Sequence, residues 1–258
     1  MEVTLSDSSP FEYIRALVYG PPGAGKTFSS LTLSDAVPAD FGAKGKPVLG
    51  RNPAVTLSDM LWLSFDSGAT EGMKQQGLRV NEIKLSQEGD KLLAALKEAP
   101  ALAKGLVDKG VKTVVIDTVT ALDEMLVTYW RNKGLEKWDL FGAVKVGHYK
   151  FAMDVKSLKA NVLFLCHAKA LMEPADATQQ NKITAAGFAK IVPDITGGAL
   201  NHYRRDSSFI LPCTVGKENN EDGRWFYTAS NKGYEAKSRY VLPPVIEADW
   251  RKIKAVTK

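Results

Sequence analysis

The chain has 258 residues, 45% of them hydrophobic and 24% charged, with a formal net charge of +5 at pH 7. This composition is typical of a globular protein and excludes a disordered or fibrous chain. The apolar runs are too short to cross a bilayer, and residues 1–13 lack the features of a signal peptide, so we expect a cytoplasmic protein without a membrane partner. The two cysteines, Cys166 and Cys213, make no disulfide framework.

A glycine-rich motif, G-x-x-x-x-G-K-T, runs from Gly20 to Thr27. The apolar run before it predicts a buried strand over 14–19, and the residues after it predict a helix that begins at Thr27 and ends near 36–38. A loop of this pattern between a strand and a helix cradles phosphates, with Lys26 on the β- and γ-phosphates and the Thr27 hydroxyl on Mg²⁺. We therefore expect ATP and Mg²⁺ to bind here. The residues expected to contact the nucleotide are Gly20, Pro21, Pro22, Gly23, Ala24, Gly25, Lys26, Thr27 and Phe28.

The next part of the chain contains weaker signals. Residues 1–12 read as a loosely held lead-in, and residues 38–57, rich in glycine and proline, read as an irregular excursion. A strand is expected over 60–66, ending on Asp66, and a short edge strand over 80–85. A helix is expected over 90–109, interrupted at Pro100 and stopped at Gly110.

A second strand is expected to end on a polar side chain. The apolar run over 113–118 ends on Asp117, and a carboxylate at the carboxyl end of a strand beside a phosphate loop holds Mg²⁺. Asp117 is therefore the candidate Walker B residue. Thr120 is expected to cap a helix. That helix carries an apolar core face formed by Leu122, Met125, Leu126 and Tyr129.

A helix is expected over 144–160, followed by a strand over 161–167 that ends on His167. At this edge of the sheet a histidine can hydrogen-bond the γ-phosphate and sense its presence. The alternative is a partly buried histidine satisfied by backbone groups. The other two histidines, His148 and His202, have no metal-ligand spacing, so Mg²⁺ is the one metal expected.

The order of these elements favours the additional-strand ATPases over GTPases and small-molecule kinases. The strand expected over 60–66 falls between the phosphate-loop helix and the Asp117 strand, and the strand after Asp117 also ends on a polar side chain. No N-K-x-D guanine signature is present, because Asn231-Lys232-Gly233 is followed by Tyr234. A kinase is kept as a minor alternative.

Several motifs together resemble the phage-encoded RecA-core ATPases, which include the Sak-type single-strand annealing recombinases. The resemblance covers about residues 14–240 and rests on the phosphate loop and on four later segments. These segments are Val114–Thr120, Leu163–His167, Ile191–Gly198, and Trp225–Thr228 before Lys237-Ser238-Arg239.

The resemblance implies that the phosphate loop and Asp117 bind ATP and Mg²⁺, and that His167 takes the sensor position. RecA-like enzymes have a catalytic glutamate shortly after the second strand, and this chain departs from that pattern. Its stretch from Phe65 to Glu71 offers both Asp66 and Glu71 as the catalytic base, and the sequence does not choose between them.

Two stretches bear on a partner. Residues 129–151 interleave cations with aromatic side chains, the two ingredients of single-strand binding, and occupy the place of the first DNA-binding loop of RecA. The alternative for this stretch is an amphipathic helix pair with some aromatics in the core and a solvated basic face. By resemblance, residues 168–199 form the second DNA-binding loop.

The C-terminal segment offers four basic residues around an apolar strand pair over 209–211 and 225–227. They are Arg224, Lys232, Lys237 and Arg239. In RecA-like filaments, basic residues of this region reach the ATP of the neighbouring subunit. Lys237 and Arg239 are the candidates for that contact, with a solvated surface charge as the alternative.

Taken together, the sequence predicts a single α/β domain over 1–258. It is expected to be a RecA-like additional-strand P-loop ATPase core, a mainly parallel sheet flanked by helices with C-terminal antiparallel strands. The expected function is an ATPase that forms a homo-oligomeric ring or filament on single-stranded DNA and promotes recombination or annealing, in the host cytoplasm if phage-encoded. The alternatives are a ring-forming helicase or packaging ATPase, and a nucleotide-gated binding or signalling module with little hydrolysis.

Overall fold

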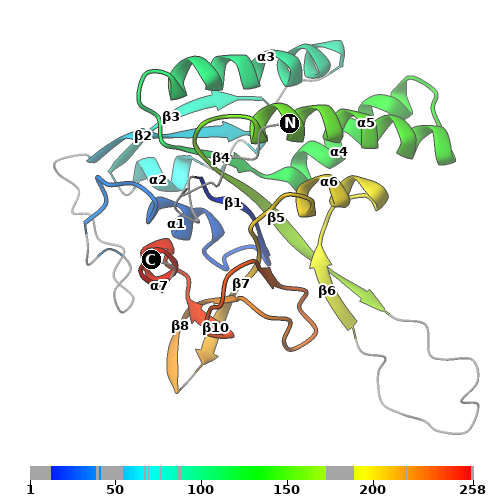
Figure 1. The fold of residues 1–258 in the computed structure, drawn as a ribbon. Coiled ribbons are helices and arrows are strands. Elements are labelled where there is room, and N and C mark those ends of the chain that lie inside the picture. Colours follow the sequence, from blue (N-terminus) through cyan, green and yellow to red (C-terminus); the bar gives the residue numbers. More distant parts are fainter. Residues whose placement is uncertain are drawn as a thin grey trace, which may run out of the picture.

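The structure is a computed structural model, shown as a ribbon in Figure 1. It describes residues 13–38, 41, 55–66, 68, 70–75, 77–85, 89–172, 189–218 and 220–256. The expected lead-in over 1–12 lies outside the described residues, as does most of the expected excursion over 38–57. Residues 55–57 of that excursion belong instead to a strand.

The described elements alternate between strands and helices over most of the chain. The strands are β1 (Arg15–Gly20), β2 (Val55–Ser64), β3 (Leu78–Lys84), β4 (Thr113–Asp117), β5 (Asn161–Met172), β6 (Ala189–Pro193), β7 (Phe209–Glu218), β8 (Glu221–Tyr227), β9 (Lys237–Ser238) and β10 (Val245–Glu247). The helices are α1 (Lys26–Leu31), α2 (Glu71–Gln75), α3 (Asp90–Val107), α4 (Val119–Asn132), α5 (Lys137–Lys156), the short 3₁₀ helix η2 (Gly197–Ala199), α6 (Leu200–Arg204) and α7 (Trp250–Val256).

The described strands form one mixed sheet in the order β10-β8-β7-β1-β5-β4-β2-β3, with β6 paired to β5 and β9 paired to β7. All pairings from β7 across to β3 are parallel. The strands β8, β10, β6 and β9 add antiparallel pairs. Because β5 lies between β1 and β4, the sheet has the order of the additional-strand ATPases. The predicted fold class is confirmed.

Helices cover both faces of the sheet. The strands are apolar on both faces, as parallel strands between two helical layers must be. Successive residues of β4 alternate between the two cores, so that Val114 and Ile116 face α3, α4 and α5, whereas Val115 faces the opposite side. Figure 1 shows α3, α4 and α5 on one face and α1, α2 and α7 on the other. The sheet is thereby shielded from water and its carboxyl edge is left to build a site.

The helix after the phosphate loop is shorter than predicted, because α1 ends at Leu31 and not near 36–38. Its hydroxyl side chains bond to its own backbone: the Ser29 and Ser30 hydroxyls donate to the Lys26 carbonyl, and the Thr32 hydroxyl donates to the Ser29 carbonyl. Such bonds compete with the helical ladder. Tight turns then follow the helix.

Two local predictions about helices are wrong. The helix α3 continues through Pro100, since the buried face that includes Leu96 and Ala103 packs on the sheet and outweighs one lost backbone bond. The cap of α4 is Thr118, whose side chain accepts from the Ala121 N–H at 3.1 Å. Thr120 makes different bonds, described below.

The helix expected over 144–160 begins seven residues earlier, at Lys137, and ends at Lys156. The strand expected over 161–167 continues to Met172, because its second half pairs with β6 after it leaves β1 and β4. The predicted strands over 14–19, 80–85 and 113–118 are confirmed as β1, the edge strand β3, and β4.

A buried polar network ties α4, α5 and α6 together. The fully buried His148 of α5 lies 2.6 Å from the Tyr203 hydroxyl through Nδ1 and 2.8 Å from Asp123 Oδ1 through Nε2. The other oxygen of Asp123 accepts from the N–H and the hydroxyl of Thr196. Every member is thus satisfied, which a buried polar network requires in order to stabilise a fold.

We predict that Asp123→Ala lowers the free energy of unfolding by about 2–4 kcal/mol, because it leaves Nε2 of the buried His148 without a partner and removes the acceptor of both Thr196 bonds. Urea denaturation measures this loss. Asp139→Ala, which removes an exposed carboxylate from α5, is the control and should change stability by less than about 0.5 kcal/mol. Equal effects of the two substitutions would show that the network contributes nothing.

Candidate functional site

The phosphate loop leaves β1 at Gly20 and enters α1 at Lys26. A Cβ atom built on Gly20 would lie 2.2 Å from the Cys213 carbonyl oxygen of β7, closer than any side chain permits. Gly23 and Gly25 have φ of 77° and 94°, in the left-handed region that glycine adopts without strain. The glycines of the motif are therefore required by close approach and by backbone conformation.

Lys26 is buried inside the loop. Its ammonium donates to the Gly20 carbonyl at 2.8 Å and to the Pro21 carbonyl at 3.0 Å. Burial lowers the pKa of Lys26, although the nearby charge of Asp117 opposes that effect. A buried cation held by neutral carbonyls would gain a full counter-charge from the β- and γ-phosphates.

Asp117 and Thr27 meet across the edge of the sheet. The Thr27 hydroxyl donates to Asp117 Oδ2 at 3.0 Å, and the carboxylate is buried at the end of β4. Burial raises the pKa of Asp117 to about 6, against the Thr27 hydrogen bond and the charge of Lys26, which lower it. A hydroxyl and a carboxylate oxygen this close suit a hard cation such as Mg²⁺.

No group of three or more His, Cys, Asp or Glu side chains that could hold a metal occurs in the described part of the chain. Thr27 and Asp117 would therefore bind Mg²⁺ together with the nucleotide and water. This is the usual arrangement for Mg²⁺, which rarely has a cage made of protein ligands alone.

The phosphate loop, β2, β4 and β5 surround a cavity of about 440 Å³. It is lined by Pro22, Gly23, Lys26, Thr27, Phe28, Leu31, Asp66, Gly68, Gly72, Met73, Asp117, Thr118 and His167. The sheet brings these residues together because the parallel strands end at the same edge. Ser64 of β2 is in register with Asp117, and Gly20 of β1 is in register with His167.

The structure distinguishes between the two acidic candidates for the base. Asp66 follows β2, lines this cavity, and its negative charge contributes to the raised pKa of Asp117, in which burial is the larger cause. Both carboxylates are exposed, but Glu71, at the start of α2, does not line this cavity. Asp66 is therefore the better-placed carboxylate.

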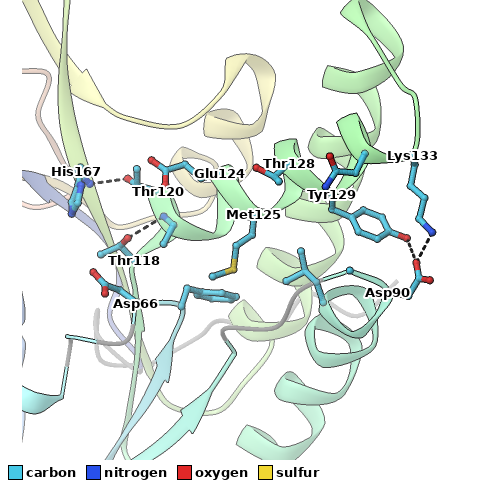
Figure 2. Close-up of a pocket in the computed structure, with 15 residues that line it drawn as sticks. Asp66, Asp90, Thr118, Thr120, Glu124, Met125, Thr128, Tyr129, Lys133 and His167 are labelled. Atoms are coloured by element: carbon cyan, nitrogen blue, oxygen red, sulfur yellow. Dashed lines mark hydrogen bonds and ion pairs between the residues drawn. The ribbon is translucent and has the colours of Figure 1, made fainter.

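His167 is half-buried, and its backbone is fixed by the neighbouring helix. Its N–H donates to the Thr120 hydroxyl at 2.9 Å (Figure 2), and that hydroxyl donates to the Asp194 carbonyl at 3.1 Å. The Asp194 N–H donates in turn to the His167 carbonyl at 2.8 Å. The prediction that this strand ends at His167 is wrong, because β5 continues to Met172. Its pairing with β1, however, ends at His167.

A family model described as an AAA domain matches residues 12–240 of the chain. The chain belongs to the AAA domain family. Membership places it among the P-loop nucleotide-binding ATPases, in agreement with the loop and sheet order described above. The match ends before β10 and α7. A comparison with curated proteins finds no match.

A second cavity, of about 1180 Å³, extends from the nucleotide edge of the AAA domain along α4 (Figure 2). Asp66, Thr118 and His167 line its inner end. At its outer end Asp90 accepts from the Tyr129 hydroxyl and pairs with Lys133, each at 2.8 Å. The nucleotide edge is thus open toward α4.

The two basic candidates for an intersubunit contact lie away from the phosphate loop of their own chain. Lys237 lies on β9 opposite Ile210, and the Arg239 N–H donates to the Ser208 carbonyl. Ser208 in turn bonds to Arg15, at the amino end of β1. Both basic side chains are exposed at this end of the sheet, so the structure does not bring them to the other site residues.

Arg224 is the one of the four basic residues of the C-terminal segment that reaches the phosphate loop, whereas the sequence favoured Lys237 and Arg239 for a contact with ATP. It lies on β8, and its guanidinium stacks over the Phe28 ring at 5.1 Å from the centroid. No signal in the sequence reveals this contact, because it depends on the register of the β7–β8 hairpin. The expected strand pair is present as that hairpin, but Phe226 pairs with Cys213, not with the 209–211 segment.

The described part of the AAA domain has no helix that is both long enough and apolar enough to cross a membrane. The expected location in the cytoplasm stays a prediction.

We predict that Asp117→Asn stabilises the nucleotide-free protein at pH 8 by up to about 3 kcal/mol, because about two pKa units separate its folded value from the ordinary value near 3.9. Between these two pKa values the folded protein binds more protons than the unfolded chain. The free energy of unfolding therefore falls as the pH rises from about 4 to about 6, and above pH 6 the full destabilisation by the buried carboxylate is present. Urea denaturation of both proteins at pH 5 and pH 8 should give a smaller difference at pH 5. A variant less stable than the parent at pH 8 would contradict a dominant cost of burial.

Proposed function

We propose that the protein binds ATP with Mg²⁺ in the 440 Å³ cavity and hydrolyses it to ADP and phosphate. One observation carries this proposal. Three neighbouring parallel strands place polar side chains at one edge of the sheet: Asp66 follows β2, Asp117 ends β4, and His167 is the last residue of β5 that pairs with β1. These side chains line the same cavity as Lys26 and Thr27. A phosphate cradle, a cation site and a carboxylate for the attacking water are the parts that such hydrolysis requires.

Each of these residues has a proposed role. Lys26 neutralises the β- and γ-phosphates, and the His167 ring hydrogen-bonds the γ-phosphate. Thr27 and Asp117 would hold Mg²⁺, which when bound neutralises charge on the β- and γ-phosphate oxygens. Asp66 orients a water molecule and accepts its proton, while the water oxygen bonds to the γ-phosphorus and the bond to the β-phosphate oxygen breaks.

We predict that Asp66→Asn slows single-turnover ATP hydrolysis by about 10²–10⁴-fold, the usual worth of a positioned base. Glu71→Gln is the matched control, since it removes a neighbouring carboxylate that does not line the cavity. Lys26→Ala should abolish productive use of ATP. Parent-like hydrolysis by Asp66→Asn would place the base elsewhere, and parent-like turnover by Lys26→Ala would contradict the phosphate-loop assignment.

We further propose that the protein binds single-stranded DNA along α5. The stretch over 129–151 is a helix pair, the alternative considered from the sequence, with Tyr129 and Phe151 buried in the core. The remaining aromatics of α5 are exposed, and Trp138 is 87% exposed. An exposed stripe follows from helical spacing. It consists of Trp138, Phe141, Lys145 and Tyr149.

The second stretch proposed to bind DNA, over 168–199, lies in part beside the exposed face of α5. Its described parts form the ends of β5 and β6 and the helix η2, whereas residues 173–188 lie outside the described residues. The Lys145 side chain lies beside Gly198 at the end of this stretch, and the Tyr149 ring lies 5.0 Å from that of His202 on the adjoining α6. The end of the second stretch therefore adjoins the stripe, which belongs to the first.

The biological role that we propose is recombination or strand annealing by a homo-oligomeric ring or filament on single-stranded DNA, as in the phage-encoded RecA-core and Sak-type proteins that the chain resembles. Lys237 and Arg239 are exposed and are available to a neighbouring subunit. A helicase or packaging motor would instead show sustained DNA-stimulated turnover with strand displacement. A nucleotide-gated signalling module would bind ATP and hardly hydrolyse it.

We predict that Lys145→Ala flattens the dependence of DNA affinity on log salt by about 0.7, the value per neutralised phosphate. Trp138→Ala should instead cost about 1–3 kcal/mol with a nearly unchanged slope, because it removes a stack and no charge. Fluorescence anisotropy with a non-hydrolysed ATP analogue measures both. Lys91→Ala on α3 is the control for charge, and Trp138→Phe should keep most of the affinity. Parent-like binding by both variants would exclude α5 and favour the signalling module.

A further inference from the structure

The side chain of Arg224 lies across the start of α1. A Cβ atom built on Gly25 would be 2.3 Å from Cδ and 2.6 Å from Nε of Arg224, so the arginine rests directly on the backbone of the phosphate loop. Its guanidinium stacks on Phe28, whose ring is stacked in turn on Phe41 at 4.5 Å. Packing against the backbone of Gly25 and against the ring of Phe28 thus holds the arginine in one place.

This cation lacks a counter-charge within the described part of the chain. None of the ion pairs formed by the described residues includes Arg224, and its Nε is buried without a hydrogen-bond partner there. The buried cation Lys26 is close to this half-buried arginine. Burial raises the pKa of the Cys213 thiol to about 12, and the positive charges of both Lys26 and Arg224 oppose that rise. Two cations beside one loop, with an unsatisfied N–H, favour an anionic ligand.

The topology determines which part of a nucleotide this arginine meets. The γ-phosphate end of the site is defined by Asp117 on β4 and His167 on β5, which lie on one side of β1. Arg224 comes from the β7–β8 hairpin, on the other side of β1. If its β- and γ-phosphates contact Lys26 and its γ-phosphate lies toward Asp117 and His167, a nucleotide would extend its α-phosphate and nucleoside toward that hairpin.

We infer that Arg224 is a nucleotide-binding residue that contacts the α-phosphate from the nucleoside side of the phosphate loop. This inference rests on the proposed function. It differs from the role considered for Lys237 and Arg239, because Arg224 acts on the nucleotide of its own chain and away from the γ-phosphate. The stack on Phe28 positions the guanidinium before the nucleotide arrives.

The test measures binding of Mg·ADP and of its two α-phosphorothioate diastereomers to the full chain by calorimetry. ADP is suitable because it has an α-phosphate and no γ-phosphate. Arg224→Gln should weaken Mg·ADP roughly 10- to 100-fold, as expected for a lost hydrogen bond between charged groups. It should also reduce the discrimination between ADP and at least one phosphorothioate diastereomer, because the sulfur and the substitution remove the same contact.

Arg79→Gln, on the edge strand β3, removes an exposed arginine and is the control for net charge. Thermal unfolding confirms that each variant is folded, and Arg224→Lys, which keeps the charge, should recover part of the affinity. Unchanged affinity of Arg224→Gln would overturn the inference. An equal loss for ADP and both phosphorothioates would also overturn it, since the contact would then be to the base or the ribose. If the parent itself fails to bind Mg·ADP while Lys26→Ala behaves identically, the proposed function fails and the inference fails with it.

Discussion

The parallel register of β1, β5, β4 and β2 is the constraint on which the site depends. Gly20 is level with His167, and Ser64 is level with Asp117, so residues far apart in sequence reach one edge of the sheet. A shift of one residue in any of these pairings would turn the side chains of that strand to the opposite face. The two apolar cores, one on each face, oppose such a shift because successive apolar residues of these strands belong alternately to one core and the other.

The same register places charged groups where water is excluded. Lys26 and Asp117 are both buried at the edge, and burial opposes the charged form of each: it lowers the pKa of Lys26 and raises that of Asp117. Their mutual attraction offsets part of this cost. A nucleotide with its metal would supply the missing charges of both signs, so the features that make the site unfavourable alone are those that favour ligand binding.

Much of the fold could be predicted from the sequence, because its signals are local. The phosphate loop has a spaced motif, and the strands β1 and β4 are short apolar runs that end on a glycine and an aspartate. The start of α5 was missed because its first turns lack an apolar face of helical period: Leu140 is buried there, whereas the large side chains of Trp138 and Phe141 are exposed. The position of Asp66, and not of Glu71, at the cavity and the approach of Arg224 to Gly25 depend on loop geometry and on strand register across the sheet. Local sequence patterns do not contain that information.

The nucleotide edge and the exposed face of α5 are joined by consecutive hydrogen bonds. The Thr120 hydroxyl bonds both the backbone at His167 and the Asp194 carbonyl, and two residues further on Thr196 bonds Asp123. Asp123 then bonds His148, on the buried side of the helix whose outer side carries the stripe. Thr120, Asp123 and His148 are buried, whereas His167, Asp194 and Thr196 are half-buried. The segment that follows β6 also packs directly against α5, so both hydrogen bonds and packing connect β5 with that helix.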